Sequence, residues 1–410
     1  MGKRARWLVL ALLLLVAAGM AVLHFMPGRT GSVLEAILPG THHLAKEPWL
    51  QAPSPTSVAI HYETAAPGQG LVQFGAGSSL DRTAPAELYD TVTYVTGKGY
   101  LYRATLAGLQ PGTAYRYRVI HRRDTGGRIR SALTTFETWP DAPERVTFIA
   151  YGDSRSGADI HEQMARQFDQ YRPAFILHTG DAVDWGYEAS EWKPDFFDPL
   201  RSIVGRVPVF IACGNHDGTA EDLKHWFDLP GGRTWYSFET GPVHVTVLDS
   251  YEQTPEVAEW LAKDLAATKA PWKFIMYHVP VSPNSYYLSE FDRQTLLPLM
   301  DKHGVDIVLA GHDHCYERFQ PLRISEGSAH AVTLITTGGG GAMLYPLFAQ
   351  VNHAFAVSEH HFCVFTVDAG QLDLKVFGAG GNEMDRATIR KIGGRLDPAY
   401  LGDAKAWEFK

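Results

Sequence analysis

The chain has 410 residues, of which 45% are hydrophobic, 20% charged and 12% aromatic. At roughly 150 residues per domain this length predicts two or three folded units, and the composition excludes a disordered, collagenous or coiled-coil chain. The formal net charge is -8, so no nucleic-acid-binding surface is evident, and an anionic ligand would need a locally positive site. The three cysteines include no C-x-x-C pair, which excludes a disulfide framework and a zinc site of that kind.

The first residues have the order of an export signal. Lys3, Arg4 and Arg6 precede an apolar run from Trp7 to Leu23, and small residues near Ala21 offer a weak cleavage site. We expect residues 1–28 to be a signal peptide that is cleaved or an anchor that attaches the chain to a membrane, and the sequence favours neither. Either predicts an exported protein, periplasmic, extracellular or membrane-anchored with its folded part outside. Residues 29–46 are mixed and Gly-containing, which suits a linker.

Residues 47–140 carry the pattern of an all-β domain. Short alternating apolar segments lie between turn signals, which predicts a β-sandwich. The segments are Ser57–Tyr62, Gly70–Gly75, Tyr89–Val95, Leu101–Leu106, Ala114–His121 and Ser131–Glu137. The stretch from Leu106 to Arg118, LAGLQPGTAYRYR, is similar to the turn-and-strand signature of fibronectin type III domains. Catalytic groups do not gather here, so a spacer or docking module is favoured.

Residues 141–385 change to strands that alternate with helices, which predicts an α/β layered domain with its chemistry at the carboxyl ends of the strands. The expected strands are Val146–Tyr151, Ala174–His178, Val207–Cys213, His244–Leu248, Lys273–Tyr277, Asp306–Ala310 and Ala331–Thr336, with alternating strands near 360–376. The expected helices are Asp159–Tyr171, Glu256–Thr268 and Arg293–His303. Residues 386–410 form a tail of mixed charge without assignable chemistry.

Five of these strands are followed by polar clusters of metal-ligand type. The clusters are Gly152-Asp153-Ser154-Arg155, Gly180-Asp181-Ala182-Val183-Asp184, Gly214-Asn215-His216-Asp217, His278, and Gly311-His312-Asp313-His314. Each is weak alone, because Gly-Asp after a strand is commonly a turn and a lone His is commonly a satisfied polar residue. Five in succession at strand ends predict one shared site.

The residue types suit two metal ions and a phosphate. Two cations about 3.5 to 4 Å apart clamp a phosphate and generate a hydroxide nucleophile, provided that one ligand bridges them. Asp181 is the candidate bridge. Because His and Asn are neutral ligands, two divalent ions against Asp153 and Asp181 leave about +2 before hydroxide binds. The site would therefore reverse the sign of the chain's net charge.

The ordered motifs, with Cys315-Tyr316-Glu317-Arg318 after the last His and the Gly338–Gly341 run downstream, resemble the calcineurin-like metallophosphoesterases, in particular the purple acid phosphatase branch. The resemblance covers residues 47–380 and implies a fibronectin-like sandwich before a four-layer α/β/β/α domain. It implies that Asp153, Asp181 and His314 hold the first metal and that Asp181, Asn215, His278 and His312 hold the second. His216 would contact the phosphate and stabilise or protonate the leaving oxygen.

Two positions depart from that resemblance. Asp184 stands where purple acid phosphatases have the Tyr that colours the iron, so we expect a protein that is not purple. Arg155 stands where other branches have a His. Its guanidinium would grip the substrate phosphate or form a structural ion pair beside the site, and the first interpretation is favoured. Asp184 is expected to be a turn or supporting residue rather than a ligand.

These observations predict a binuclear-metal phosphoesterase that hydrolyses a small phosphomonoester by attack of a metal-bound hydroxide on phosphorus, with iron, manganese or zinc as the metals. His216 and Arg155 are the predicted catalytic and substrate-binding residues. One alternative is a phosphodiesterase acting on nucleotide or lipid head-group esters. Another is a surface binding protein with an impaired first metal site. Cys213 and Cys315 would form a disulfide or remain buried thiols.

Overall fold

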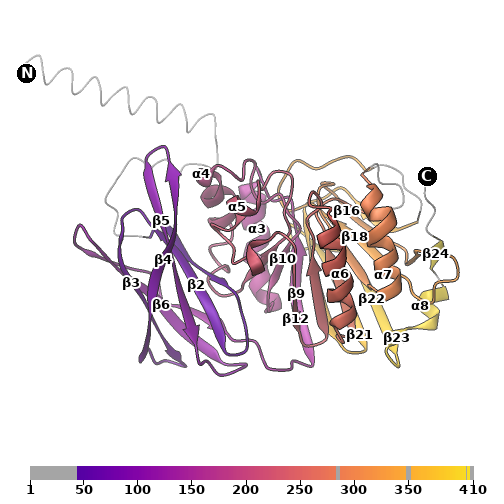
Figure 1. Ribbon diagram of the computed structural model, residues 1–410, viewed down its shortest axis with the longest axis horizontal. Coiled ribbons are helices and arrows are strands. Elements are labelled where there is room, and N and C mark those ends of the chain that lie inside the picture. Colours follow the sequence, from indigo (N-terminus) through magenta and orange to yellow (C-terminus); the bar gives the residue numbers. More distant parts are fainter. Residues whose placement is uncertain (1–43, 283–286, 348–351, 403, 407–410) are drawn as a thin grey trace, which may run out of the picture. The chain divides into compact units, whose positions relative to one another are not determined.

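The computed structural model describes residues 44–282, 287–347, 352–402 and 404–406 (Figure 1). The predicted signal or anchor, residues 1–28, lies outside them. Among the residues that are described, no helix has the length and apolar character needed to cross a membrane.

The first domain is the expected β-sandwich, and each of the six predicted segments contains a strand. Its strands are β1 (Lys46–Gln51), β2 (Ser57–Thr64), β3 (Gly68–Ala76), β4 (Arg82–Tyr94), β5 (Gly97–Ala107), β6 (Ala114–Arg123), β7 (Arg128–Arg130) and β8 (Thr134–Glu137). They are ordered β1-β2-β5-β4-β3-β6-β7, with β8 on β6. The long β4 pairs with β3 through residues 82–86 and with β5 through residues 87–94, so one strand serves both faces of the sandwich.

The second domain contains two seven-stranded sheets within the described residues. The first sheet is ordered β11 (Val209–Ile211), β10 (Ile176–His178), β9 (Arg145–Tyr151), β20 (His361–Asp368), β21 (Gln371–Gly378), β22 (Glu383–Ile392) and β23 (Arg395–Leu396). The second is ordered β12 (Tyr236–Thr240), β13 (Val243–Val247), β14 (Trp272–Met276), β15 (Ile307–Ala310), β18 (Thr333–Thr337), β16 (Tyr316–Phe319) and β19 (His353–Val357). The short strands β17 (Leu322–Arg323) and β24 (Lys405–Ala406) pair separately.

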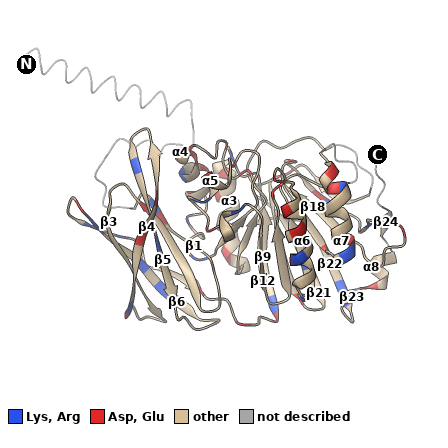
Figure 2. Cartoon of the chain, in the orientation of Figure 1, with Lys and Arg blue, Asp and Glu red and all other residues tan. Residues whose placement is uncertain are grey.

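Helices cover the outer faces of both sheets, which gives the expected four layers. The described helices are α3 (Ala158–Phe168), α4 (Ala189–Trp192), α5 (Ala220–Leu223), α6 (Pro255–Ala267), α7 (Leu297–His303) and α8 (Pro398–Gly402), with π-turns at η2 (Lys193–Phe197) and η4 (Asp292–Leu296) and 3₁₀ turns at η1 (Asp169–Tyr171) and η3 (Pro230–Gly232). Helix α8 differs from the others, because its Tyr400 and Leu401 pack on the core between the sheets. The helix expected over Arg293–His303 begins as η4, because Pro298 has no N–H to donate to the preceding turn. Figure 2 shows residues of both charge signs on α6 and α7.

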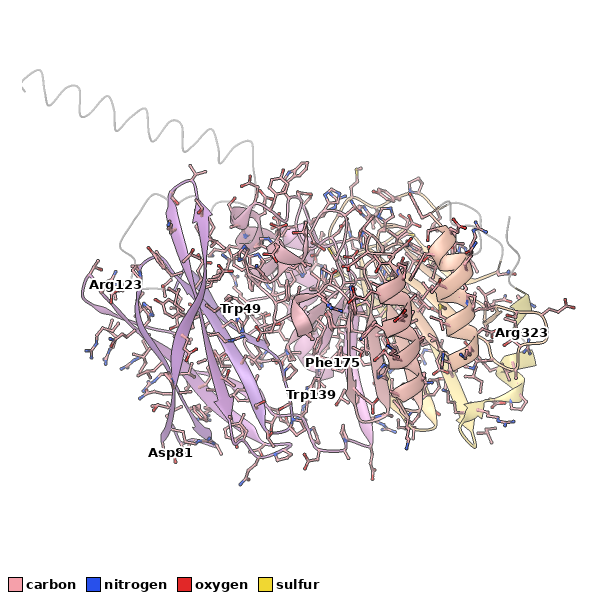
Figure 3. All side chains as sticks on the ribbon, viewed as in Figure 1. Trp49, Asp81, Arg123, Trp139, Phe175 and Arg323 are labelled. Atoms are coloured by element: carbon pink, nitrogen blue, oxygen red, sulfur yellow. The ribbon has the colours of Figure 1, made fainter. Side chains whose placement is uncertain are left out.

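The two-residue period of the strands places one set of side chains between the sheets and the other under the helices. On β9, Phe148 joins the core between the sheets, while Tyr151 joins the core under α3. On β14, Phe274 faces the same inter-sheet core, and Ile275 packs toward α6 and α7. Trp139, at the junction of the two domains, packs its ring 6.0 Å from that of Phe175 (Figure 3).

The sandwich shares a hydrophobic core with the second domain. The ring centroids of Trp49, on β1, and Phe197 lie 4.7 Å apart, and Trp49 donates its indole N–H to the Trp226 carbonyl at 2.8 Å. Lys46 is buried, is ion-paired with buried Glu63, and lies 4.3 Å over the Trp226 ring. These contacts fix the sandwich to η2 and to the segment that follows the Asn215 loop, and its role as a spacer or docking module stays a prediction.

The C-terminal residues continue the first sheet. The expected domain boundary at residue 385 falls inside β22, whose residues 383–390 pair with β21. Arg318 of the second sheet forms a bidentate ion pair with Asp385 at 2.7 and 2.9 Å, which ties β22 to β16.

Candidate metal centre

The predicted ligands all follow the carboxyl ends of strands. Strands β9, β10 and β11 run parallel in the first sheet and are followed by the Asp153, Asp181 and Asn215 loops. Strands β14 and β15 run parallel in the second sheet and are followed by His278 and the His312 loop. One oxygen or nitrogen from each of Asp153, Asp181 and His278 lies within 4.8 Å of the others. The two sheets thus deliver their strand ends to one place.

The backbone turns sharply at three of these positions. Asp153, Asp181 and His312 have φ of +58°, +55° and +66°, a region that residues with a side chain adopt at a cost. Backbone bonds hold the turns, because Asp153 donates its N–H to the Gly180 carbonyl at 2.8 Å and His312 donates its N–H to both Asp153 carboxylate oxygens at 3.0 and 2.9 Å. The strain is therefore built into the residues expected to bind metal.

The six predicted ligands contact one another through their donor atoms. His314 Nε2 lies 3.5 Å from Asp153 Oδ1, and His278 Nε2 lies 3.4 Å from Asp181 Oδ1. Asn215 Oδ1 lies 3.1 Å from His278 Nε2 and 3.0 Å from His312 Nδ1. His314 thus lies beside Asp153 and His278 beside Asp181, while the His312 N–H also reaches Asp153, and the assignment of these residues to two metals stays a prediction.

Three histidines have their tautomer fixed by backbone carbonyls. Nδ1 of His278 lies 2.8 Å from the Thr179 carbonyl oxygen, Nδ1 of His314 lies 2.7 Å from that of Met343, and Nδ1 of His216 lies 2.9 Å from that of Asp184. A carbonyl only accepts, so each Nδ1 carries a proton and each ring turns Nε2 toward the site, where Nε2 of His278 and His314 can offer a lone pair to a metal. The sequence does not predict these contacts, because a backbone carbonyl leaves no residue-type signal.

The electrostatics of the cluster suit cations. Asp153 and Asp181 are almost completely buried, and burial, with the neighbouring Asp181 charge, raises the pKa of Asp153 well above its usual range. Burial and the nearby His278 lower the pKa of His312 to about 4. The two buried carboxylates carry more negative charge than Arg155, whose Nε lies 3.5 Å from Asp181 Oδ2, can neutralise, and metal ions would supply further positive charge. Asp153, Asp181 and His278 could therefore hold a metal.

Arg155 and Asp184 form a pair at the edge of the cluster. Arg155 Nη1 lies 3.0 Å from Asp184 Oδ1, and its Nε lies 3.5 Å from Asp181 Oδ2. The Asp184 carboxylate also accepts the Ser156 hydroxyl, with 2.6 Å to each oxygen. Its oxygens group with those of Glu191 and Asp195 rather than with Asp153 or Asp181. Arg155 thus makes the ion pair in this structure, and Asp184 turns away from the predicted ligands.

Asp217 holds two loops of the site together, a role that its place in the Gly-Asn-His-Asp motif could have signalled. Its carboxylate accepts the N–H groups of Asp181, Ala182 and Gly214 at 2.7, 2.7 and 2.9 Å. Burial and the Asp181 charge raise the pKa of Asp217 to about 7.

Cys213 and Cys315 are both free and buried in the structure, so they do not form the disulfide that the sequence left as one alternative.

Two family models match the chain, one for each domain. Residues 136–316 match the calcineurin-like phosphoesterase model, and residues 47–138 match the purple acid phosphatase N-terminal domain. Residues 136–316 therefore carry a calcineurin-like phosphoesterase domain. Members of this family are hydrolases of phosphoric esters with a binuclear metal centre. This phosphoesterase also resembles the purple acid phosphatases in carrying both domains in this order.

Known proteins similar to this phosphoesterase include one named as an acid phosphatase and one named as probably inactive. Acid phosphatase type 7 of Mus musculus is 27% identical over 310 residues, which is 65% of this chain and 69% of that protein. Probable inactive purple acid phosphatase 27 of Arabidopsis thaliana is 24% identical over 310 residues, 60% of this chain and 50% of its own length. The matches thus span about half to seven tenths of these relatives.

A solved structure shares the fold of this phosphoesterase. Purple acid phosphatase PPD1 from yellow lupin (Lupinus luteus) seeds superposes with a TM-score of 0.73 at 20% identity, covering 85% of this chain and 75% of that one. The likeness confirms an all-β domain followed by a metallophosphoesterase domain.

Proposed function

We propose that this phosphoesterase is an exported phosphomonoesterase with two metal ions, the first held by Asp153, Asp181 and His314 and the second by Asp181, Asn215, His278 and His312. The observation that carries the proposal is the convergence of Asp153, Asp181 and His278 within 4.8 Å. Export is supported by Lys3, Arg4 and Arg6 ahead of the apolar run.

The donor set admits iron, manganese or zinc, because it combines carboxylate, amide and imidazole ligands. When bound, such ions supply a water-derived nucleophile and neutralise the charge of the phosphate. The fixed Nδ1 protons of His278 and His314 support this role, since the carbonyls that accept them hold each ring in position.

His216 is the proposed proton donor to the leaving oxygen. Its Nδ1–H is held by the Asp184 carbonyl, and its Nε2 lies 4.0 Å from Asp181 Oδ2, beside the proposed metals. The P–O ester bond breaks, hydroxide derived from water forms the new P–O bond, and the departing alkoxide takes the Nε2 proton of the imidazolium form of His216, which the proton released by the water restores. Arg155 is the proposed phosphate contact, because its guanidinium lies at the edge of the ligand cluster and suits a phosphate, for which it would give up part of its ion pair with Asp184.

Two other functions remain open to test. A phosphodiesterase would use the same ligands, because the metal ligands alone do not determine whether the substrate is a monoester or a diester. A binding protein with an impaired site is favoured by the Arg155–Asp184 ion pair and by the similarity to a relative named probable inactive.

Hydrolysis of 4-nitrophenyl phosphate and bis(4-nitrophenyl) phosphate by the full chain tests the proposal. Apo protein is loaded in turn with manganese, zinc and iron, and bound metal is measured by inductively coupled plasma analysis. We expect about two ions per chain and faster turnover of the monoester, with a loss on the order of a hundredfold or more in Asn215→Ala. Asn382→Ala, in an exposed turn, is the matched control and should behave as wild type.

Each other result selects an alternative. Faster turnover of the bis-ester would indicate a phosphodiesterase. Two bound ions without turnover of either ester, or no retained metal, would favour the binding protein.

A further inference from the structure

Two large aromatic side chains stand exposed on a fixed loop beside His216. Trp185 is 55% exposed and Tyr187 is 63% exposed, and their ring centroids lie 6.1 Å apart at an interplanar angle of 55°. The Trp185 ring also lies 6.4 Å from the His216 ring. Folding gains little from side chains that remain in water, so burial does not account for them.

The backbone that carries this pair is tied to the His216 loop on both sides of Trp185. The Asp184 carbonyl accepts the His216 Nδ1–H at 2.9 Å, and the Gly186 N–H donates to the His216 carbonyl at 2.7 Å. A Cβ at position 186 would lie 1.9 Å from the Asp217 carbonyl oxygen, so glycine permits the close approach. The aromatic pair is therefore held at a set place relative to the proposed proton donor.

Other exposed aromatics at the site are engaged with the predicted ligands. Tyr251 donates its hydroxyl to Asn215 Oδ1 at 3.3 Å, Tyr287 meets the His312 ring edge-on at 4.8 Å, and Tyr345 stacks on the His314 ring at 4.1 Å. Trp185 instead makes its ring contacts with Tyr187 and His216. The pair thus lies on the side of His216, apart from the three tyrosines that contact ligands.

From this placement we propose that Trp185 and Tyr187 bind a planar ring in the alcohol part of the substrate, so that the preferred substrates are aryl or nucleoside phosphates. The inference rests on the proposed function, because a proton donor to the leaving oxygen must lie on the leaving-group side of phosphorus. A ring attached to that oxygen then extends past His216 toward Trp185. Stacking on an indole suits any planar ring, whether phenyl or nucleobase.

Matched pairs of substrates measure the contribution of the planar ring to kcat/KM. 5′-AMP and ribose 5-phosphate share the same primary alcohol and differ by the base, while benzyl and cyclohexylmethyl phosphate differ in planarity. We expect kcat/KM to favour the planar member of at least one pair about tenfold, the scale of base–aromatic stacking. The nucleotide pair and the benzyl pair distinguish the two sources of the ring.

Substitutions test whether the preference for planar rings comes from Trp185 and Tyr187. Trp185→Ala should bring the ratio close to one, and Trp185→Phe, which keeps a planar face, should retain most of it. Leu88→Ala, at a side chain 49% exposed on the sandwich, is the control and should leave the ratio unchanged. A wild-type ratio near one for both pairs, or a ratio that survives Trp185→Ala, would overturn the inference.

A binding measurement separates this inference from the proposed function. The probes are non-hydrolysable phosphonates of adenosine and of ribose, added to the metal-loaded full chain. We expect the adenosine phosphonate to protect Trp185 from acrylamide quenching and the ribose phosphonate to protect it much less. Hydrolysis of all monoesters without ring preference or protection would leave the phosphatase standing and refute the ring site. Protection without hydrolysis would support the ring site and refute the phosphatase.

Discussion

The histidines of this chain divide according to what their ring nitrogens contact. At the site, a backbone carbonyl fixes Nδ1 of His278 and His314, and Nε2 faces a carboxylate. Away from the site, His161 is completely buried, with Nε2 2.7 Å from the Tyr151 hydroxyl and Nδ1 3.0 Å from the Asp195 carbonyl. In His278 and His314, Nε2 is therefore placed to bind a metal together with a carboxylate. In His161, both ring nitrogens have hydrogen-bond partners within the core.

Burial of His161 predicts a loss of stability in mild acid. Burial lowers the pKa of His161 from its ordinary 6.5 to about 4. Between pH 6.5 and pH 4, His161 is protonated in the unfolded chain but not in the folded chain. The free energy of unfolding therefore falls as the pH drops from 6.5 toward 4. This one residue should cost about 2 kcal/mol between pH 7 and pH 5. Urea unfolding at the two pH values measures the loss.

His161→Gln is the comparison, because an amide can donate to the Asp195 carbonyl and accept from Tyr151 without titrating. Its stability should fall less steeply with acid, by about the same 2 kcal/mol. If the free energy of unfolding fell equally with acid in wild type and in His161→Gln, the loss of stability would not come from His161.

At the scale of elements, the glycine run after β18 supports the loop after β9. The Gly340 N–H donates to the Gly152 carbonyl at 2.8 Å, and the Ala342 N–H donates to the Asp153 carbonyl at 2.9 Å. A Cβ on Gly338 would lie 2.4 Å from the Asp313 carbonyl oxygen, and one on Gly340 would lie 2.2 Å from that of Gly152. The run thus brings backbones together that side chains would separate.

Gly340→Ala should therefore disturb the Asp153 loop. Because the added methyl meets a backbone oxygen, the chain must shift, at a cost of about 1–3 kcal/mol in the free energy of unfolding. The shift should also weaken metal retention during dialysis. Gly402→Ala adds a methyl where no atom lies within 4 Å and is the matched control. Equal stability and metal content in the two variants would show that the loop tolerates the methyl.

Sequence patterns predict the elements that have local signals and miss those stabilised by distant contacts. The strands that precede the ligands are predictable because each combines an apolar run with a Gly, Asp, Asn or His at its end. Strand β1 is missed, because Lys46 and Glu47 have the character of solvated residues beside the expected linker; the structure gives Lys46 a buried partner 17 residues away. Likewise, the departure of Arg155 and Asp184 from the motifs is visible in the sequence, but their pairing needs the fold.

At the scale of the whole molecule, the described sandwich and phosphoesterase domains share one core. Trp49, Val92 and Leu101 of the sandwich belong to the same buried cluster as Phe197 and Trp226 of the second domain. Hydrogen bonds across this contact include the Tyr117 hydroxyl to the Gly205 carbonyl at 2.7 Å. Because α5 and Trp226 come after the His216 loop in the chain, the sandwich packs against the segment that follows the proposed proton donor.

The shared core predicts that the two domains unfold together. Trp49→Ala removes an indole packed on Phe197 and leaves the Trp226 carbonyl without its donor, so we expect a loss of about 3–5 kcal/mol in the free energy of unfolding. Hydrogen exchange read by mass spectrometry along a urea series follows peptides of each domain separately. Peptides from β5 and β14 should lose protection at one urea concentration in wild type, and both should lose it at a lower concentration in Trp49→Ala.

The control is Leu88→Ala, at a half-exposed side chain on the same sandwich. It should change the free energy of unfolding of either domain by no more than about 0.5 kcal/mol. If β5 peptides lost protection first while β14 peptides stayed protected, the two domains would unfold independently.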